Sequence, residues 1–255
     1  MSNKRFPTIR DLCVLSLATA ATLSLLVTSC FGGGNDEDTP VASGHPGGCL
    51  DREPEEDQNL LANSSFEQGE EPWISLAEDS GFEVSEEQVH TGERSAWLRM
   101  RDSAGAADHK VYYLVQEITP EEMPEVICGY YRVESWMKGS RHQYLQAVAI
   151  AFKPTNFADT YANYQIRYLL AGADSPPFNI DNGKFVFVTR EEPVTGEWVP
   201  FELHVKDDFK ELWGSVPEGF ESLRLLFEVR WDNKVAGESP AEADAFYDDL
   251  YAGAE

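Results

Sequence analysis

The sequence after residue 58 predicts an all-β fold, a β-sandwich of the jelly-roll type. Three observations predict it: short runs of alternating or apolar residues recur, clusters of Gly, Pro, Asn and Asp separate them, and no long helical period is visible. The chain has 255 residues, of which 42% are hydrophobic and 12% aromatic. That apolar content is enough to fill the core of one sandwich and too high for a disordered protein.

Nine strands are predicted in order along this part of the chain. They are expected at Ser95–Arg101, Val111–Ile118, Gly129–Lys138, Leu145–Phe152, Tyr164–Leu170, Lys184–Thr189, Trp198–Val205, Leu223–Trp231 and Ala245–Ala252. Turn signals such as Ser175-Pro176-Pro177 and Asp181-Asn182-Gly183 bound them, because Pro presets φ and Gly tolerates positive φ. A brief helical turn is expected near Lys206–Leu212.

Residues 1–29 have the layout of a secretory signal. Lys4, Arg5 and Arg10 form a basic start, and Leu12–Val27 is an apolar run. The run is shorter than the ~20 residues that a membrane span needs. We therefore expect this segment to direct export and to take no part in the fold.

The export segment closes with Val27-Thr28-Ser29-Cys30. An aliphatic residue and two small residues before Cys resemble a bacterial lipobox, in which the Cys thiol is diacylated and becomes the mature N-terminus. The resemblance predicts lipidation of Cys30 and a place in the cell envelope of a bacterium, on the outer membrane or cell surface. The alternatives are an ordinary signal peptide with an incidental Cys, or an uncleaved anchor.

Residues 30–58 are predicted to be a flexible tether between this Cys and the folded part, residues 59–255. They are rich in Gly, Pro and acidic residues and have few large apolar groups, so they cannot bury enough surface to become ordered. Cys49 and Cys128 are the candidate disulfide pair, in keeping with an oxidising compartment. The alternative is two unrelated free thiols.

The charge balance excludes two classes of partner. Lys and Arg total 20 against 45 Asp and Glu, a formal net charge of -25. Such a surface repels phosphate backbones and anionic lipid headgroups, so we exclude nucleic-acid binding and electrostatic docking to membranes. Contact with a membrane is expected only through the N-terminal lipid. Acidic glycans are disfavoured for the same reason.

Five motifs carry a family resemblance that covers about residues 59–252. They are Asn59–Gly69 followed by Trp73, Val89–Leu98, Tyr131–Lys138, Gly196–Phe201 and Phe246–Tyr251. In this order they resemble the carbohydrate-binding modules of families 4, 9 and 22, which are galactose-binding-like β-jelly rolls. Ser64 replaces a Gly that is common in the first motif. The resemblance implies non-catalytic binding of a neutral oligo- or polysaccharide.

The resemblance also implies a structural Ca²⁺ where the first motif, the His-x-Gly loop and the last strand meet. The candidate ligands are Glu67, a backbone carbonyl near Glu93 or Ser95, and Asp248, with Asp249 in reserve. Asp248 shares strand parity with Leu250, so an inward Leu250 predicts an inward carboxylate that a cation would compensate. The alternative is that Asp248 accepts backbone N–H bonds and Glu67 is solvated.

Strand alternation also predicts a ligand-binding face that mixes Arg and Glu with aromatic rings. Pyranose C–H surfaces pack on rings, and planar polar groups bond to neighbouring hydroxyls. We expect a shallow cleft on one sheet, lined by Trp97, Arg132, Glu134, Trp136, Glu228 and Arg230. The alternative is a solvated face of Arg–Glu pairs. Phe157, Tyr161 and Phe178 either form the rim of this cleft or cover edges of the core.

The sequence does not favour an enzyme. The five His residues show no metal-binding spacing, and no Gly-x-Ser-x-Gly elbow or phosphate-binding Gly loop is present. Glu134 and Glu228 are the carboxylates that a jelly-roll glycoside hydrolase would need, but each has an Arg neighbour that keeps it ionised. A surface lipoprotein that binds a protein partner, or has a structural role, is the stronger alternative to carbohydrate binding.

Overall fold

The computed structural model describes residues 58–76, 81–102, 109–139, 142–157, 161–234, 237 and 239–255. The predicted export signal, the lipidation of Cys30 and the tether up to residue 57 lie outside these residues. Cys128 is disulfide-bonded. The other three cysteines all precede residue 58, so the pairing with Cys49 stays a prediction.

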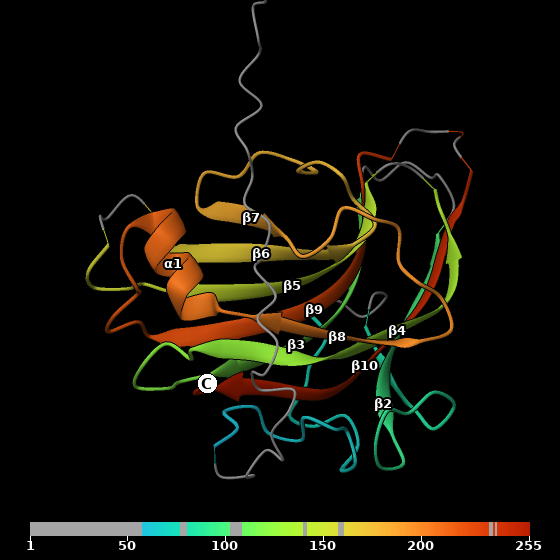
Figure 1. Cartoon of the computed structure of the whole chain (residues 1–255), viewed down its shortest axis with the longest axis horizontal. Coiled ribbons are helices and arrows are strands. Elements are labelled where there is room, and N and C mark those ends of the chain that lie inside the picture. The colour runs from blue at the N-terminus through green and yellow to red at the C-terminus, as the bar shows by residue number, and fades with distance from the viewer. Residues whose placement is uncertain are drawn as a thin grey trace, which may run out of the picture. The chain divides into compact units, whose positions relative to one another are not determined.

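The described residues form two five-stranded sheets (Figure 1). The first sheet has the order β1-β2-β10-β4-β8, with strands at Glu83–Ser85, Ser95–Asp102, Ala241–Gly253, Val126–Met137 and Trp198–Leu203. The second sheet has the order β3-β9-β5-β6-β7, with strands at His109–Ile118, Ser222–Asp232, Gln143–Phe152, Asn163–Ala171 and Gly183–Phe187. The predicted β-sandwich jelly roll is therefore confirmed.

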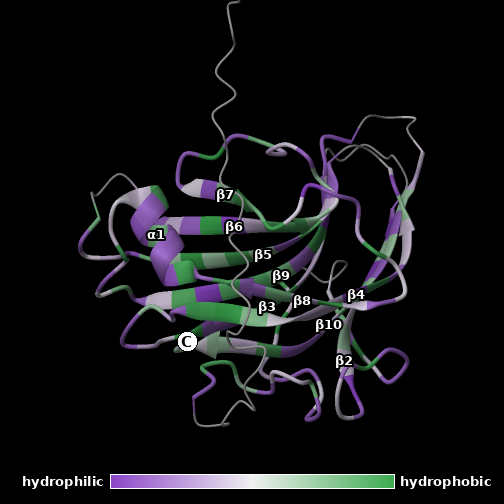
Figure 2. Ribbon diagram, viewed as in Figure 1, coloured by the Kyte–Doolittle hydropathy of each residue, from purple (hydrophilic) through white to green (hydrophobic). Residues whose placement is uncertain are grey.

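Each of the nine predicted strands overlaps one of these strands, and β1 was not predicted. Neighbouring strands are antiparallel except β6 and β7, which are parallel. Hydrophobic and hydrophilic residues alternate along the strands (Figure 2). This alternation gives each strand one face toward the interior of the sandwich and one face away from it.

The main core lies between the sheets. On β9 its members are alternate residues, Leu225, Phe227 and Val229 among them, and on β10 the buried Ala245 and Tyr247 join them. Full burial of a side chain such as Phe227 contributes about 1.5–3 kcal/mol. The residues of β9 between these core positions face away from the interior.

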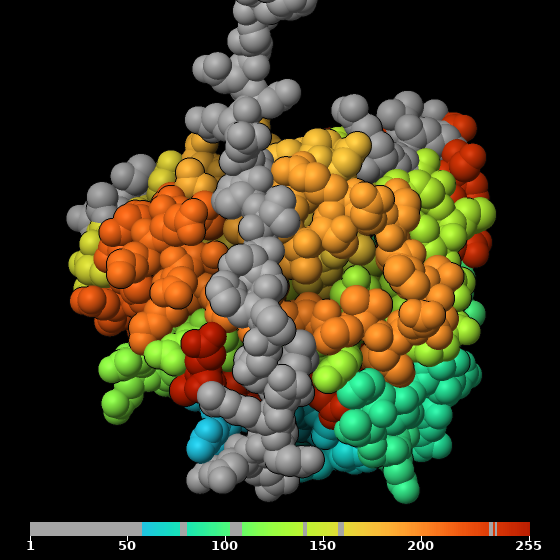
Figure 3. Space-filling model, viewed as in Figure 1, coloured from blue at the N-terminus to red at the C-terminus, as the bar shows by residue number. Residues whose placement is uncertain are grey.

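The predicted helical turn is part of helix α1, Val205–Trp213. Its buried residues Val205 and Phe209 belong to the main core, and Gly214 ends it in the left-handed conformation with φ 78°. The helix and the segment after β7 conceal much of β5 and β6 in the view of Figure 3. Among the described residues no helix is long and apolar enough to cross a membrane.

The start of the described chain lies beside the last strand. Asn59 Nδ2 donates to the Leu250 carbonyl at 2.9 Å, and the Leu60 N–H donates to the Ala252 carbonyl at 2.8 Å. The Leu250 N–H in turn donates to the Ser64 carbonyl at 3.1 Å. The first motif and the last strand therefore meet as the sequence predicted.

Candidate functional site

The structure divides the six predicted ligand-binding residues between the two sheets. The first sheet carries Trp97 on β2 and Arg132, Glu134 and Trp136 on β4, and the second carries Glu228 and Arg230 on β9. The prediction that one sheet presents all six is wrong. Alternation assigns a residue to a face of its own strand, whereas membership of a sheet depends on pairing between distant strands.

The polar side chains on the outward face of the first sheet are paired with one another. We call this the first outer face; it includes Trp97, Arg101, Arg132, Glu134 and Asp244. Arg132 Nε and Nη2 lie 2.9 and 2.8 Å from Glu134 Oε2, and Trp97 Nε1 donates to Asp244 Oδ1 at 3.2 Å. Burial raises the pKa of Asp244, but bonds from Arg101, Ser135 and Trp97 outweigh it and hold the pKa below its ordinary value. The predicted alternative, a face of Arg–carboxylate pairs, describes this surface.

Trp136 is fixed at the end of β4. Its Nε1 donates to Glu192 Oε2 at 2.8 Å, and Lys138 Nζ, which lies 2.7 Å from Glu192 Oε1, sits 5.9 Å from the ring centroid. The ring is half-buried and packs against the main core. The register between β10 and β4 shifts at Asp244/Ala245, so Trp136 lies opposite the core residue Ala243, and the prediction that it shares a face with Arg132 and Glu134 is wrong. Trp136 therefore joins the segment after β7 to the sandwich.

The outward face of the second sheet is built differently. We call it the second outer face; it includes Tyr113, Val115, Gln146, Val148, Gln165, Arg167, Leu226, Glu228 and Arg230. Val115, Val148 and Leu226 form an apolar stripe across three strands that is separate from the main core. Tyr113 packs against this stripe. Buried polar groups flank the stripe on the side of Glu228.

Glu228 and Arg230 belong to a buried polar cluster on this face. Glu228 accepts a hydrogen bond from Gln146 Nε2 and lies 3.6 Å from Arg230 Nη1. Arg230 also donates to Asp232 through Nη2 at 2.9 Å and Nε at 3.1 Å, and Tyr144 donates to the same carboxylate at 2.5 Å. Burial lowers the pKa of Arg230, but Glu228, Tyr144 and Asp232 outweigh it, so the pKa lies above its ordinary value.

Arg167, in the middle of β6, differs from Arg230. Its Nε and Nη1 atoms are buried and have no hydrogen-bond partner among the described residues. Burial lowers the pKa of Arg167, and the nearby charge of Glu228 offsets this only in part. The Oε1 atoms of Gln146 and Gln165 are likewise buried without a partner in the described part of the chain. Two donors and two acceptors on one face are therefore left unbonded.

Sequence reasoning missed Arg167, Gln146 and Gln165. The signal was present, because the predicted strand Tyr164–Leu170 alternates apolar Ile166 and Tyr168 with polar Gln165 and Arg167. The same alternation identified Arg230 on β9. What the sequence does not contain is which polar groups stay unbonded after folding.

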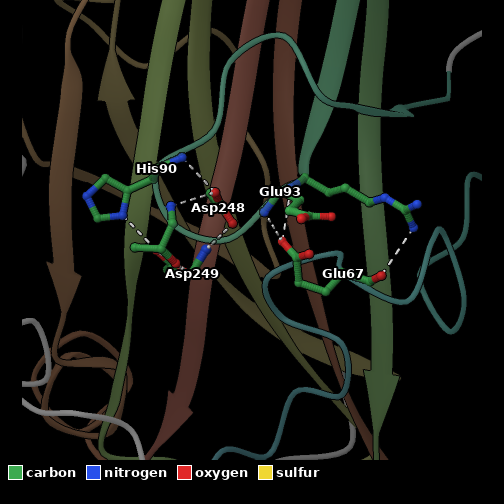
Figure 4. Close-up of polar contacts among 7 residues, drawn as sticks. Glu67, His90, Glu93, Asp248 and Asp249 are labelled. Atoms are coloured by element: carbon green, nitrogen blue, oxygen red, sulfur yellow. Dashed lines mark hydrogen bonds and ion pairs between the residues drawn. The ribbon is translucent and has the colours of Figure 1, made fainter.

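Glu67, Asp248 and Asp249 lie around the loop that carries His90 and Glu93 (Figure 4). Glu67 Oε1 accepts the N–H groups of Glu93 and Arg94 at 2.8 and 2.9 Å. Asp248 Oδ2 accepts the N–H of His90 at 2.9 Å. Burial, with a further contribution from Asp249, raises the pKa of the Asp248 carboxyl to about 7.

The parity argument for Asp248 is wrong. The register of β10 shifts between Asp248 and Tyr251, where Asp249 has φ 48°, and both Tyr247 and Leu250 lie in the main core. Asp248 therefore points away from the core and is buried beneath the His90 loop.

The remaining predicted ligands are bonded within the protein. Ser95 Oγ donates to the Gln88 carbonyl at 2.5 Å, and Asp249 Oδ2 lies 2.6 Å from His90 Nδ1. A buried carboxyl with a raised pKa is a group that a cation stabilises. The carboxylates of Glu67 and Asp248 accept N–H groups from different parts of the loop, however, and with Asp249 they do not form a group of ligand atoms within 4.8 Å of one another. The N–H bonds to Glu67 and Asp248 also match the alternative without metal. Calcium therefore stays a prediction.

One group of acidic and His side chains in the described ranges has ligand atoms within 4.8 Å of one another, and it contains none of the predicted ligands. It consists of Glu202, His204 and Glu255. His204 already lies 3.4 Å from Glu202 and 3.3 Å from Glu255 in ion-pair contacts.

No protein-family model matches the chain, and no curated protein matches it. A solved structure of a family 61 carbohydrate-binding module in complex with β-1,4-galactotriose is 14% identical, with a TM-score of 0.42, over 78% of this chain and 99% of that chain. A family 22 xylan-binding domain from Paenibacillus barcinonensis is 16% identical, with a TM-score of 0.36, over 77% and 96%. A family 28 module specific for non-crystalline cellulose is 10% identical, with a TM-score of 0.40, over 77% and 96%. At these identities the likeness is one of fold.

Proposed function

We propose that the protein binds carbohydrate through the second outer face. The observation that carries this proposal is the set of unbonded polar atoms on that face, Nε and Nη1 of Arg167 with Oε1 of Gln146 and Gln165. A buried polar group without a partner costs about 1–3 kcal/mol of stability. Native proteins keep few such groups, and a bound partner is one explanation for several of them on one face.

Sugar hydroxyls complement this set. A hydroxyl group both accepts and donates, so one hydroxyl bonds to an Arg167 N–H and to a glutamine oxygen at the same time. The unbonded Nε and Nη1 atoms lie on different edges of the planar guanidinium, so they suit two different hydroxyls of a bound sugar. A ligand with donors only, or acceptors only, would leave half of the set unbonded.

The apolar part of the second outer face suits the other half of a sugar. Val115, Val148 and Leu226 form a nonpolar stripe beside the polar groups, and Tyr113 borders it. Sugar C–H groups pack against such surfaces and against aromatic rings. In the structure the three stripe residues are buried and Tyr113 is half-buried, so a sugar would reach this stripe only after a covering group moves.

The charges favour a neutral oligo- or polysaccharide. In the polar cluster, the two cations Arg167 and Arg230 are matched by the two carboxylates Glu228 and Asp232. The protein as a whole has a formal charge of -25, which repels an acidic glycan. A neutral ligand does not disturb the matched charges of the polar cluster and is not repelled by the net charge of the protein.

The role we propose is non-catalytic and takes place at the cell envelope, where the predicted lipid on Cys30 would hold the protein. Glu134 and Glu228, the two carboxylates considered for hydrolysis, lie on different sheets. Glu228 is moreover buried and bonded to Gln146. This separation supports binding without hydrolysis.

The test is a glycan array on the purified protein, followed by calorimetry with the glycan that it retains. Arg167→Ala removes both free donors and should weaken binding at least about tenfold, because a hydrogen bond to a charged group contributes about 1.5–3 kcal/mol. The matched control, Arg132→Ala on the first outer face, should stay within about twofold of wild type. Equal binding by Arg167→Ala would contradict the location, and no glycan retained by the wild-type protein would contradict the function.

A further inference from the structure

The connection between β6 and β7 crosses the second outer face. The two strands are parallel, with Gln165 opposite Gly183, so residues 172–182 must return along the sheet from the end of β6 to the start of β7. Phe178 and Ile180 of this connection pack on Tyr144, Leu169 and other residues of a cluster on this side of the sheet. The connection therefore lies over the face that carries Arg167.

Phe178 covers the polar cluster. Its ring centroid lies 5.5 Å from the guanidinium carbon of Arg167 and 5.4 Å from that of Arg230. The ring also meets Phe185 of β7 edge-on, with centroids 5.2 Å apart. A single half-buried ring thus contacts both arginines of the proposed site.

We propose that residues 172–182 form a lid over Arg167 and that a sugar reaches the guanidinium by displacing Phe178. This inference rests on the proposed function. Nε and Nη1 of Arg167 are buried, so no ligand can contact them unless a covering group moves. Phe178 belongs to a loop, whereas Phe185 and Tyr144 belong to paired strands whose displacement would break the sheet.

The attachment of the loop suits such a movement. Its ends are fixed by backbone bonds: the Gly172 N–H donates to the Glu191 carbonyl at 2.7 Å, and the Asn182 carbonyl accepts the Gln165 N–H at 3.0 Å. Between these ends, Asn233 Nδ2 donates to the Pro177 carbonyl at 2.7 Å, and Arg190 Nη1 donates to the Asp174 carbonyl. Pro176 and Pro177 have no N–H, so the stretch just before Phe178 donates no backbone bonds to the sheet.

The experiment is chemical modification of arginine with phenylglyoxal, followed site by site with peptide mass spectrometry and no sugar present. Phe178→Ala removes the covering ring and should raise the rate of modification at Arg167 at least about tenfold, because the rate follows the fraction of molecules that are open. Asn233→Ala releases one attachment and should raise it by a smaller factor. Arg99, exposed on β2 of the first sheet, is the internal control and should be modified at the same rate in all three proteins.

An Arg167 rate in Phe178→Ala equal to that of wild type would overturn the lid. If Phe178→Ala does not fold, as judged by its melting curve, the rate in Asn233→Ala decides in the same way. Because the labelling needs no sugar, its outcome is independent of the glycan array. If the variants are labelled faster but the wild-type protein binds no glycan, the proposed function alone is contradicted. If the wild-type protein binds a glycan but the variants are labelled at the wild-type rate, the lid alone is contradicted.

Discussion

The two outer faces of the sandwich contain similar residues in different states. On the first outer face, Arg132 is paired with Glu134, and Asp244 accepts bonds from its neighbours. On the second outer face, Arg167 is half-buried, and its Nε and Nη1 atoms are buried without a partner among the described residues. Composition alone does not distinguish these faces, since both mix Arg, carboxylates and aromatic rings. The difference teaches that residue types alone do not locate a site, and that the unbonded atoms of Arg167, Gln146 and Gln165 are what set the second outer face apart from the Arg132–Glu134 pair.

The two arginines of the second outer face also differ in whether their polar atoms are bonded. Arg230 has Asp232 and Glu228 as partners, and its pKa lies above the ordinary value. Arg167 lacks a bonded carboxylate among the described residues, and its pKa is lowered by burial. We interpret Arg230 as part of the framework and Arg167 as the group that meets the ligand.

The largest expected effect is on the free energy of unfolding, and it compares Glu228 of the second outer face with Glu134 of the first. Glu228→Ala leaves the buried Gln146 Nε2 without its acceptor and takes the nearest carboxylate charge from Arg167, while Arg230 keeps Asp232, and it should lower the free energy of unfolding by about 3 kcal/mol. Glu134→Ala, on the first outer face, removes an exposed partner of Arg132 and should cost about 0–1 kcal/mol. Urea denaturation of both variants measures the two losses of unfolding free energy. Equal losses would contradict the claim that the polar groups of the two faces differ in burial and pairing.

The pH dependence of stability compares two carboxylates of β10. The pKa of Asp248 is raised to about 7 in the folded state, so its ionisation opposes folding, and stability should fall by about 3 kcal/mol between pH 5 and pH 8 in EGTA. The pKa of Asp244 is lowered, so its contribution has the opposite sign and is lost as the pH falls through the acid range.

Calcium should reverse the behaviour of Asp248. A bound cation favours the ionised carboxylate, so with Ca²⁺ in excess the fall in stability toward pH 8 should disappear and the melting temperature should rise. Denaturation curves at pH 5, 6, 7 and 8, each with EGTA and with Ca²⁺, measure both effects. Identical curves in the two media would contradict the calcium prediction and leave the N–H bonds as the full account of this site.

The smallest expected effect concerns the tryptophan of the first outer face. The Trp97 ring lies parallel to Phe246, with centroids 5.7 Å apart, and its Nε1 is bonded to Asp244. Because these contacts hold it within the protein, Trp97→Ala should leave glycan affinity within about twofold of wild type. Calorimetry measures the affinity of this variant. A loss of affinity comparable with that of Arg167→Ala would indicate that the glycan binds to the first sheet.

Much of the fold could be predicted from the sequence. Strand alternation is local, so it identified nine strands and the core-facing residues of β9, such as Phe227. The strand it missed, Glu83–Ser85, is only three residues long and too short to show a period. The helix was predicted only as a brief turn near Lys206–Leu212, which lies within α1.

Less of the site could be predicted, because it depends on contacts between distant segments. Alternation placed Arg132 and Arg230 each on an outward face but did not assign them to different sheets. The bulge at Asp249, which reverses parity along β10, has no Gly to mark it. The free donors of Arg167 result from what surrounds β6 after folding, and no sequence pattern records them.

The most direct test of the second outer face is Arg167→Met, measured for stability and for binding together. A buried cation without a partner opposes folding, so a nonpolar side chain of similar length should leave the free energy of unfolding unchanged or raise it by up to about 1 kcal/mol. Affinity for the retained glycan should fall at least about tenfold. A variant that loses about 2 kcal/mol of stability and binds as the wild type does would show that Arg167 supports the fold, and would contradict the account.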